Sequence, residues 1–175
     1  MRSHLAQRIL REHRPEQDAI LVILPCSSRK PYDKSRTQSL YRRALLRAVN
    51  GRASDIEFAS LSGLHGIVPD AFAQSREVLR YNANLNRSSS LRAVGMTPGQ
   101  AREHATKMAS RFLVRYGPAY SAVVGFGREN YRRVLAVLKD GKFPRLIVLP
   151  SCGQRLSTGG LDELCAVVHG LCQSG

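Results

Sequence analysis

The sequence of 175 residues contains no apolar run near the ~20 residues that a membrane-spanning helix needs, which argues against an integral membrane protein. Its first residues are basic and have no long apolar centre and no small-residue cleavage site, so they do not resemble a secretory signal. Internal repeats and low-complexity stretches are absent as well. We therefore expect one cytoplasmic domain that spans residues 1–175 and makes no membrane contact.

Cysteines are few, and their spacing is not that of a metal site. No Cys-x-x-Cys pair and no His-x-x-x-His pair is present, so the sequence predicts no metal and no cofactor, and free thiols are expected in a reducing cytosol. Cys165 and Cys172 lie on an apolar stripe at helical spacing and are expected in the core. Cys26 and Cys152 each follow an apolar run.

Acidic residues are scarce, with 13 Asp and Glu against 27 Lys and Arg, which gives a net charge of +14. A strongly positive surface releases counterions when it neutralises a polyanion, which favours a nucleic-acid or nucleotide partner. A compositional bias toward arginine, with the charges scattered over solvated faces, is the alternative. The arginines are spread along the whole chain and form no tail. The oligomeric state is left open.

Four short apolar runs predict buried strands, and helical patterns lie between them. The strands are expected at residues 19–24, 56–61, 121–126 and 145–149. The helices are expected before the first strand, at residues 40–50, 97–117 and 128–140, and from residue 160. This order predicts a three-layer α/β/α fold with a mainly parallel sheet. Residues 71–94 are polar and are expected to form a long functional loop that covers a substrate or contacts nucleic acid.

The candidate functional residues lie at the ends of the predicted strands, above all after the first one. Ligands bind outside the carboxyl ends of parallel strands, where we expect Cys26, Ser62, Gly127 and Cys152 to gather. Backbone amides and the cations Arg29 and Lys30 should lower the pKa of the Cys26 thiol, and the thiolate is the nucleophile. The strand exit at Cys152 is similar, although Pro and small residues suit any strand exit. Among the histidines, His65 follows a strand and is therefore the candidate for general acid–base catalysis.

The residues after Cys26 resemble the signature of archaeosine synthase, which reads Pro-Cys, three residues, Lys-Pro-Tyr, two residues, Ser, two residues, His. The matching residues are Pro25-Cys26, Lys30-Pro31-Tyr32 and Ser35, while Gln38 stands in place of the histidine. A glutamine can orient a ligand but cannot shuttle a proton. Later segments are similar to small bacterial and phage domains, including relatives of the peroxide-stress protein YaaA. These segments are Leu40-Tyr41, Ser62–Ile67, Tyr81-Asn82 and Gly127–Tyr131, so the resemblance spans residues 19–165.

In archaeosine synthase the resembling domain adds an amine to the nitrile of 7-cyano-7-deazaguanine in tRNA. The resemblance therefore implies an enzyme that modifies a 7-deazaguanine-type base, in nucleic acid or as a nucleoside, through attack of Cys26 on the nitrile carbon. The implied catalytic residues are Cys26, Lys30, Ser35 and His65. The implied substrate-binding residues are Ser27, Ser28, Arg29, Tyr32, Gln38, Tyr41, Ser62, Tyr81, Arg128, Asn130 and Tyr131.

Other interpretations remain open at this point. Tyr41 also fits core packing, and residues 128–131 also fit an ordinary helix start. The chain as a whole also fits a non-catalytic nucleic-acid-binding domain, or a glycosidase-like or stress-response enzyme that acts on a nucleoside. Replacement of the signature histidine by Gln38 favours these two alternatives, whereas the retained Cys-Lys-Pro-Tyr-Ser run favours nitrile chemistry.

Overall fold

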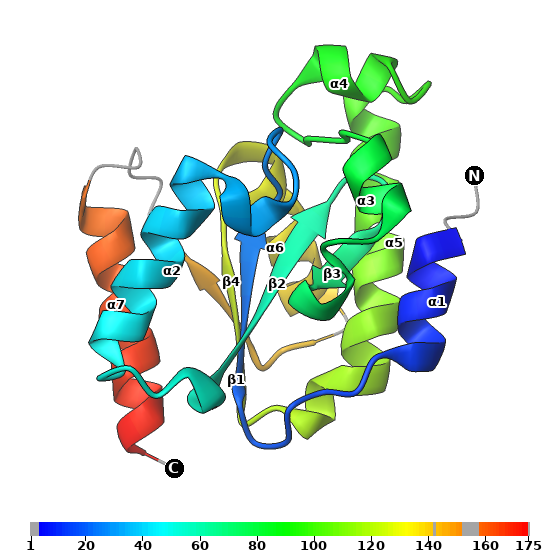
Figure 1. The fold of residues 1–175 in the computed structure, drawn as a ribbon. Coiled ribbons are helices and arrows are strands. Elements are labelled where there is room, and N and C mark those ends of the chain that lie inside the picture. Colours follow the sequence, from blue (N-terminus) through cyan, green and yellow to red (C-terminus); the bar gives the residue numbers. More distant parts are fainter. Residues whose placement is uncertain (1–3, 142, 152–157, 175) are drawn as a thin grey trace.

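A five-stranded sheet forms the centre of the protein in a computed structural model that describes residues 4–141, 143–151 and 158–174 (Figure 1). The strands lie in the order β3-β2-β1-β4-β5. β1 pairs in parallel with both β2 and β4, β4 pairs in parallel with β5, and only β3 is antiparallel. The strands are β1 (Ile20–Pro25), β2 (Ile56–Ser62), β3 (Gly66–Pro69), β4 (Ala122–Phe126) and β5 (Leu146–Leu149).

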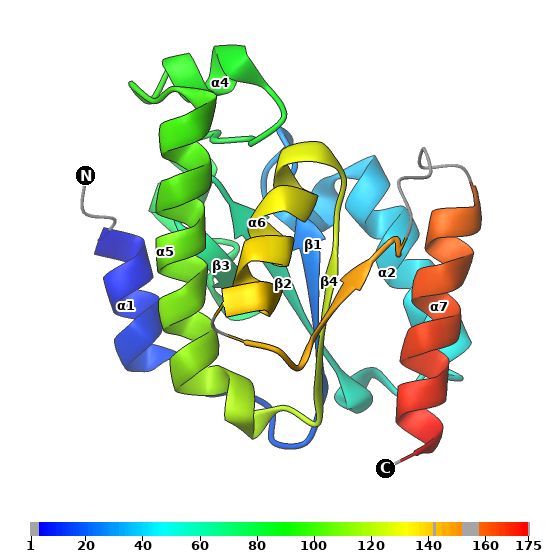
Figure 2. The ribbon, with the colours of Figure 1, turned by 180° about the vertical axis from the view of Figure 1, so that it is seen from behind.

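Helices cover both faces of the sheet, which confirms the predicted three-layer α/β/α fold. α2 (Arg36–Ala48) and α7 (Thr158–Gln173) lie on one face. α1 (His4–Glu12), α5 (Pro98–Tyr116) and α6 (Glu129–Gly141) lie on the other (Figure 2). The alternating side chains of β1 explain this arrangement, because successive residues of a strand point to opposite faces. Its odd-numbered residues Leu21 and Ile23 pack with α1, α5 and α6, and its even-numbered residues pack with α2 and α7.

The helix boundaries follow local chemistry that the sequence contains. The Thr97 side chain accepts from the Gln100 amide and the Gln100 side chain accepts from the Thr97 amide, which completes the predicted capping box of α5. α2 ends before Asn50 and Gly51, whose φ angles of 55° and 77° lie in the left-handed region. Leu40 is 52 % exposed although it is apolar and lies on α2.

The stretch 71–94 is not the long irregular loop that its polar composition predicts. It contains α3 (Arg76–Arg80) and α4 (Ser88–Arg92), which lie beyond the carboxyl ends of β1 and β2 (Figure 1). Its few apolar side chains anchor it, because Val78, Leu85 and Leu91 are fully buried in the core. Short 3-10 turns complete the chain at Tyr32–Lys34, Ala53–Asp55, Asp70–Phe72 and Gly117–Ala119.

Two further expectations are corrected or refined by the packing. β3 was not predicted, because its four residues are too short to show a strand period and are bounded by glycine and proline. Cys165 and Cys172 pack against the α2–α7 core but are only partly buried, so they lie at its margin and not inside it. No helix in the described part of the chain is both long and apolar enough to cross a bilayer.

Candidate active site at the carboxyl edge of the sheet

The carboxyl ends of β1, β2 and β4 meet at one edge of the sheet. The β1–β2 register pairs Pro25 with Leu61, and the Cys26 amide extends it by donating to the Leu61 carbonyl at 3.1 Å. Gly127 follows β4 at the same edge and donates its amide to Leu149 at 3.0 Å. The predicted gathering of Cys26, Ser62 and Gly127 is therefore confirmed, while Cys152 lies outside the described residues.

The Cys26 thiol is held by segments that are distant in the sequence. Its Sγ lies 3.0 Å from the Tyr131 hydroxyl and 3.7 Å from the Ala83 carbonyl. The same hydroxyl accepts the Leu85 amide proton at 3.2 Å and lies 3.3 Å from the Cys26 carbonyl. Tyr131 thus joins α6, the 83–85 segment and the end of β1 around one sulfur atom. Only 4 % of Cys26 is exposed.

The predicted lowering of the Cys26 pKa is wrong, because burial raises the pKa of this thiol above its ordinary value. The charge of Lys30, the Tyr131 hydroxyl and the Gly63 backbone act in the opposite direction, and they do not overcome burial. Burial also lowers the pKa of Lys30. Both shifts favour the neutral pair, a thiol beside an amine, over the thiolate–ammonium pair.

Lys30 and Tyr32 lie near the thiol, because the charge of Cys26 acts on both groups. Lys30 donates from Nζ to the Ser27 carbonyl at 2.6 Å, and the same atom lies 3.8 Å from the centre of the Tyr32 ring. Tyr32 is 1 % exposed and hydrogen-bonds to Ser62. Burial raises the pKa of Tyr32 well above its ordinary value, so this phenol stays protonated.

Ser35 and Gln38, the last two signature positions, brace the end of β1. Ser35 caps α2 by accepting the Gln38 amide proton at 3.5 Å. The Gln38 side chain donates to the Pro25 carbonyl at 2.7 Å and to the Ser60 hydroxyl at 2.9 Å. Its oxygen accepts from Arg42, which also pairs with Asp70. Gln38 therefore fixes the strand exit that carries Cys26.

A cavity of about 640 Å³ opens beside Cys26, which lies within the range for small-molecule sites. It lies outside β1 and β4, where the strand order reverses and where open α/β sheets bind ligands. The predicted residues that line it are Cys26, Ser27, Ser28, Arg29, Ser35, Gln38, Tyr41, Arg128 and Tyr131. Tyr41 also packs edge-on against Phe126, with the ring centres 5.2 Å apart, so it belongs to both the core and the cavity wall.

Lys30, Tyr32, Ser62, His65, Tyr81 and Asn130 do not line this cavity. The Ser62 hydroxyl accepts the amide protons of Leu64 and His65. Burial lowers the pKa of His65 to about 4, so this imidazole is neutral at pH 7. Tyr81 is 45 % exposed.

Asn130 holds the 85–86 segment against α6. Its side-chain amide donates to the Leu85 carbonyl at 2.8 Å, and its backbone amide donates to Asn86 at 3.2 Å. Arg102 donates in turn to the Asn130 side-chain oxygen at 3.0 Å. Asn130 thus reaches the site indirectly, through the segment that also contacts Tyr131.

Sequence reasoning missed several residues of the cavity wall, namely Arg36, Thr37, Asn84, Asn86, Arg87 and Glu129. Asn84 donates to the Cys26 carbonyl at 3.4 Å and so contacts the site directly. The polar composition of residues 71–94 was a signal for Asn84 and Arg87. Glu129 has no local sequence signal, although its φ of 50° sets it apart in the structure.

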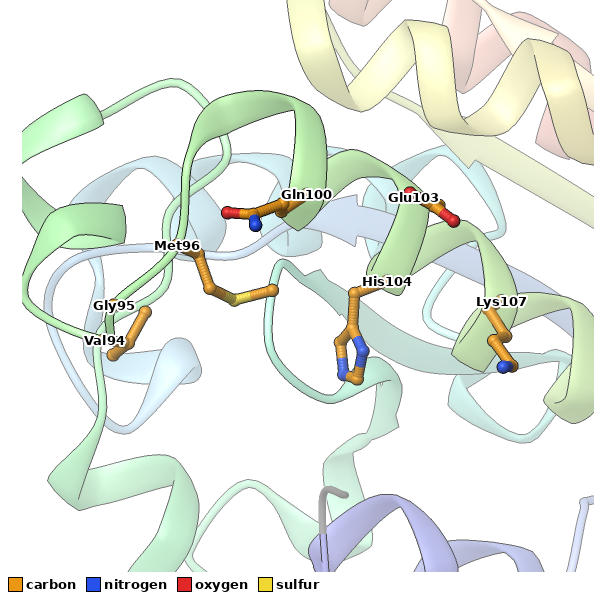
Figure 3. A pocket seen from close by; sticks show the side chains of 7 residues that line it. All are labelled: Val94, Gly95, Met96, Gln100, Glu103, His104 and Lys107. Carbon is orange, nitrogen blue, oxygen red and sulfur yellow. The ribbon is translucent and has the colours of Figure 1, made fainter. Parts of the chain in front are cut away.

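A second hollow, of about 350 Å³, lies where α4 leads into α5 (Figure 3). Met96 and His104 face it, and His104 is tied through Nε2 to the Leu64 carbonyl at 3.0 Å. It shares no lining residue with the cavity at Cys26. Among the described residues, no group of three or more His, Cys, Asp or Glu is placed to hold a metal ion.

Fold and site together define an open α/β domain that carries a buried thiol in the wall of a cavity at the switch point of its sheet. Residues 3–148 match the family model described as a domain of unknown function (DUF5591), and the chain belongs to this family. Its resemblance to domains related to archaeosine synthase is likewise confirmed.

Two known proteins show how far the similarity extends. Over 64 residues the chain is 36 % identical to archaeosine synthase subunit alpha of Thermococcus kodakarensis, a stretch that covers 36 % of this chain and 11 % of that protein. The solved structure of AF0587, a protein of unknown function, superposes with a TM-score of 0.62 at 21 % identity and covers 95 % of this chain and 50 % of that one. This second likeness shows the fold alone, and the chain spans half or less of either relative.

Proposed function

We propose that this domain is an enzyme that modifies a 7-deazaguanine-type base, with Cys26 as the nucleophile. The observation that carries the proposal is the Cys26 thiol, held 3.0 Å from the Tyr131 hydroxyl in the wall of a cavity of about 640 Å³. The similarity to archaeosine synthase subunit alpha supports the choice of base.

The chemistry follows from a neutral thiol that is activated only when substrate arrives. The amine of Lys30, whose pKa burial lowers, accepts the thiol proton as sulfur attacks the nitrile carbon. A carbon–sulfur bond forms, one π bond of the nitrile breaks, and the nitrile nitrogen gains the proton that sulfur lost, which gives a neutral thioimide. An amine co-substrate then attacks the same carbon, the carbon–sulfur bond breaks, and a proton of the amine passes to the departing sulfur, which restores the thiol for another turnover.

Tyr131 assists the attack as a hydrogen-bond donor. Burial, followed by the effect of Cys26, raises the pKa of this phenol well above its ordinary value, so it remains protonated throughout. A protonated hydroxyl at 3.0 Å stabilises the negative charge that develops on sulfur and on the returning thiolate. The product of the cycle is an amidine in place of the nitrile.

Cationic side chains around the cavity favour a base that carries phosphate, in nucleic acid or as a nucleotide. They come from the β1 exit, the first turn of α2, the 84–87 segment and the start of α6, and they are Arg29, Arg36, Arg87 and Arg128. None of them pairs with a carboxylate in the part of the chain that the structure describes. Arginine side chains without a carboxylate partner can bind phosphate oxygens through their guanidinium groups.

Intact-protein mass spectrometry after incubation with 7-cyano-7-deazaguanine, as the free base and within tRNA, tests the proposal. The thioimide adds the mass of the nitrile compound to the protein. Cys26→Ala should abolish this adduct, and Cys165→Ala, which changes a partly buried cysteine elsewhere, should leave it intact. Absence of the adduct from the unmodified protein with both substrates would refute the proposal.

A second candidate is a nucleic-acid-binding domain without catalysis, and the raised pKa of Cys26 favours it, because a thiolate is scarce at neutral pH. This candidate predicts RNA or DNA binding that weakens steeply with added salt, because each neutralised phosphate releases counterions. It also predicts equal affinity for Cys26→Ala and no covalent adduct. Adduct formation excludes it.

A further inference from the structure

The wall of the Cys26 cavity is rich in hydrogen-bond donors and poor in available acceptors. A guanine-type base presents two adjacent donors on its pairing edge, the ring N1–H and the 2-amino group, which a carboxylate matches because it accepts at two oxygens. One available carboxylate matches such an edge better than separate hydroxyl or carbonyl oxygens, because its two oxygens are held side by side.

The amide oxygens in the wall are already engaged by the protein. Gln38 Oε1 accepts from Arg42 at 3.0 Å, and Asn84 Oδ1 accepts from the Asn86 amide at 2.9 Å. Asn86 Oδ1 accepts in turn from the Asn130 amide at 3.2 Å. These three contacts hold the cavity wall together, and each uses one of the two lone pairs of an amide oxygen.

Glu129 is the remaining candidate, because its side chain is the one carboxylate among the residues that line the cavity. Within the described residues, it takes part in no hydrogen bond and no ion pair that would occupy its oxygens. It stands beside Arg128 at the start of α6, on the rim that the cavity shares with a neighbouring hollow. Its negative charge is accompanied by four arginines among the residues that line the cavity.

The backbone at Glu129 is a second, independent observation, because Glu129 alone among the residues that line the cavity has a positive φ. Its φ is 50°, in the left-handed region that glycine adopts freely and that a side chain with a Cβ disfavours. Strained positions of this kind cluster at functional sites. A glycine would relieve the strain, so the glutamate side chain at this position has a cost in stability.

We infer that Glu129 determines the base specificity of the site by accepting the N1–H and 2-amino protons of a guanine-type base. The inference rests on the proposed function, because it assigns the pairing edge of the base that Cys26 attacks. It selects guanine-type bases over their counterparts without the 2-amino group, which leave one carboxylate oxygen unpaired.

The test compares 7-cyano-7-deazaguanine with its 2-deamino analogue, using the concentration that gives half-maximal covalent adduct. The unmodified protein should prefer the 2-amino compound about 10-fold or more. Glu129→Ala should weaken capture of that compound about 10- to 100-fold and bring the two compounds within about twofold of each other. Glu129→Gln should also lose the preference, because its amide nitrogen presents a donor to a donor.

Two further variants separate recognition from structure. Glu129→Gly relieves the strained φ, so it should raise the melting temperature and still lose the preference. Glu103→Gln removes a carboxylate from the α5 hollow of Figure 3 and should leave the preference unchanged. A preference that survives in Glu129→Ala, or that returns in Glu129→Gly, overturns the inference while the proposed chemistry stands. Absence of adduct from the unmodified protein overturns both.

Discussion

Replacement of Tyr131 by Phe removes one oxygen atom at the point where three segments meet. That oxygen contacts the Cys26 sulfur at 3.0 Å and accepts the Leu85 amide proton at 3.2 Å. The aromatic ring and its packing against the core remain, so the change isolates the hydroxyl. Two consequences follow, one for stability and one for the thiol.

The stability consequence comes from the Leu85 amide, which lies in a residue that is 1 % exposed. A buried donor without its acceptor costs about 1–3 kcal/mol. In a domain of this size each kcal/mol corresponds to about 2–4 °C in melting temperature, so the variant should melt roughly 2–12 °C lower. Chemical denaturation should report the same loss in the free energy of unfolding.

The expected change in the pKa of the Cys26 thiol has a definite direction. The Tyr131 hydroxyl lowers the Cys26 pKa, although burial raises it by more. Without the hydroxyl the pKa should rise further, so the pH at which alkylation by iodoacetamide reaches half its maximal rate should move upward. The position of this midpoint is the measurement, because the absolute rate also depends on how easily the reagent reaches a buried sulfur.

Tyr81→Phe is the matched control, since it removes the same atom from a side chain that is 45 % exposed. It should leave both the melting temperature and the alkylation midpoint of Cys26 unchanged. An alkylation midpoint in Tyr131→Phe that stays constant or falls would refute the view that this hydroxyl stabilises the thiolate. The account of burial at this sulfur would fail if Cys26 in the unmodified protein titrated below the ordinary range of thiols.

Two other predictions concern pH and packing. Burial lowers the pKa of His65 to about 4, so the folded state binds fewer protons than the unfolded state below pH ~6.5. The free energy of unfolding should therefore fall by about 1.4 kcal/mol for each pH unit as the pH is lowered from ~6.5 to about 4. In urea unfolding, the free energy of unfolding of His65→Gln should decline less steeply with falling pH than that of the unmodified protein. Parallel pH curves for the two proteins would contradict the assignment of this pH dependence to His65. Gly66→Ala should cost roughly 2–5 kcal/mol, because φ is +72° and the new Cβ would lie 2.6 Å from Met108 Cβ. Gly99→Ala, with only Thr97 Oγ1 at 4.0 Å, should be neutral or stabilising, and equal melting temperatures for these two variants would contradict this reasoning.

Much of the fold is determined by patterns that are local in the sequence. The β-branched run at residues 19–24 appears as a strand shifted by one residue, since it needs only continuous apolar side chains. The capping box at Thr97 and the left-handed turn after α2 are likewise contained within a few residues. The placement of Cys26 beside Ser62 followed from parallel strands alone, because their carboxyl ends share one edge.

The chemical state of the site depended on contacts that no local pattern contains. Ala83 and Tyr131, which surround the Cys26 sulfur, lie 57 and 105 residues away in the chain. The neighbouring cations predicted a lowered pKa for the thiol, but the burial that these distant segments impose raises it. The same segments bring Glu129 to the cavity. Sequence therefore determined which residues stand at the carboxyl edge, whereas tertiary packing decided how far each is removed from water, and desolvation depends on everything that surrounds a group.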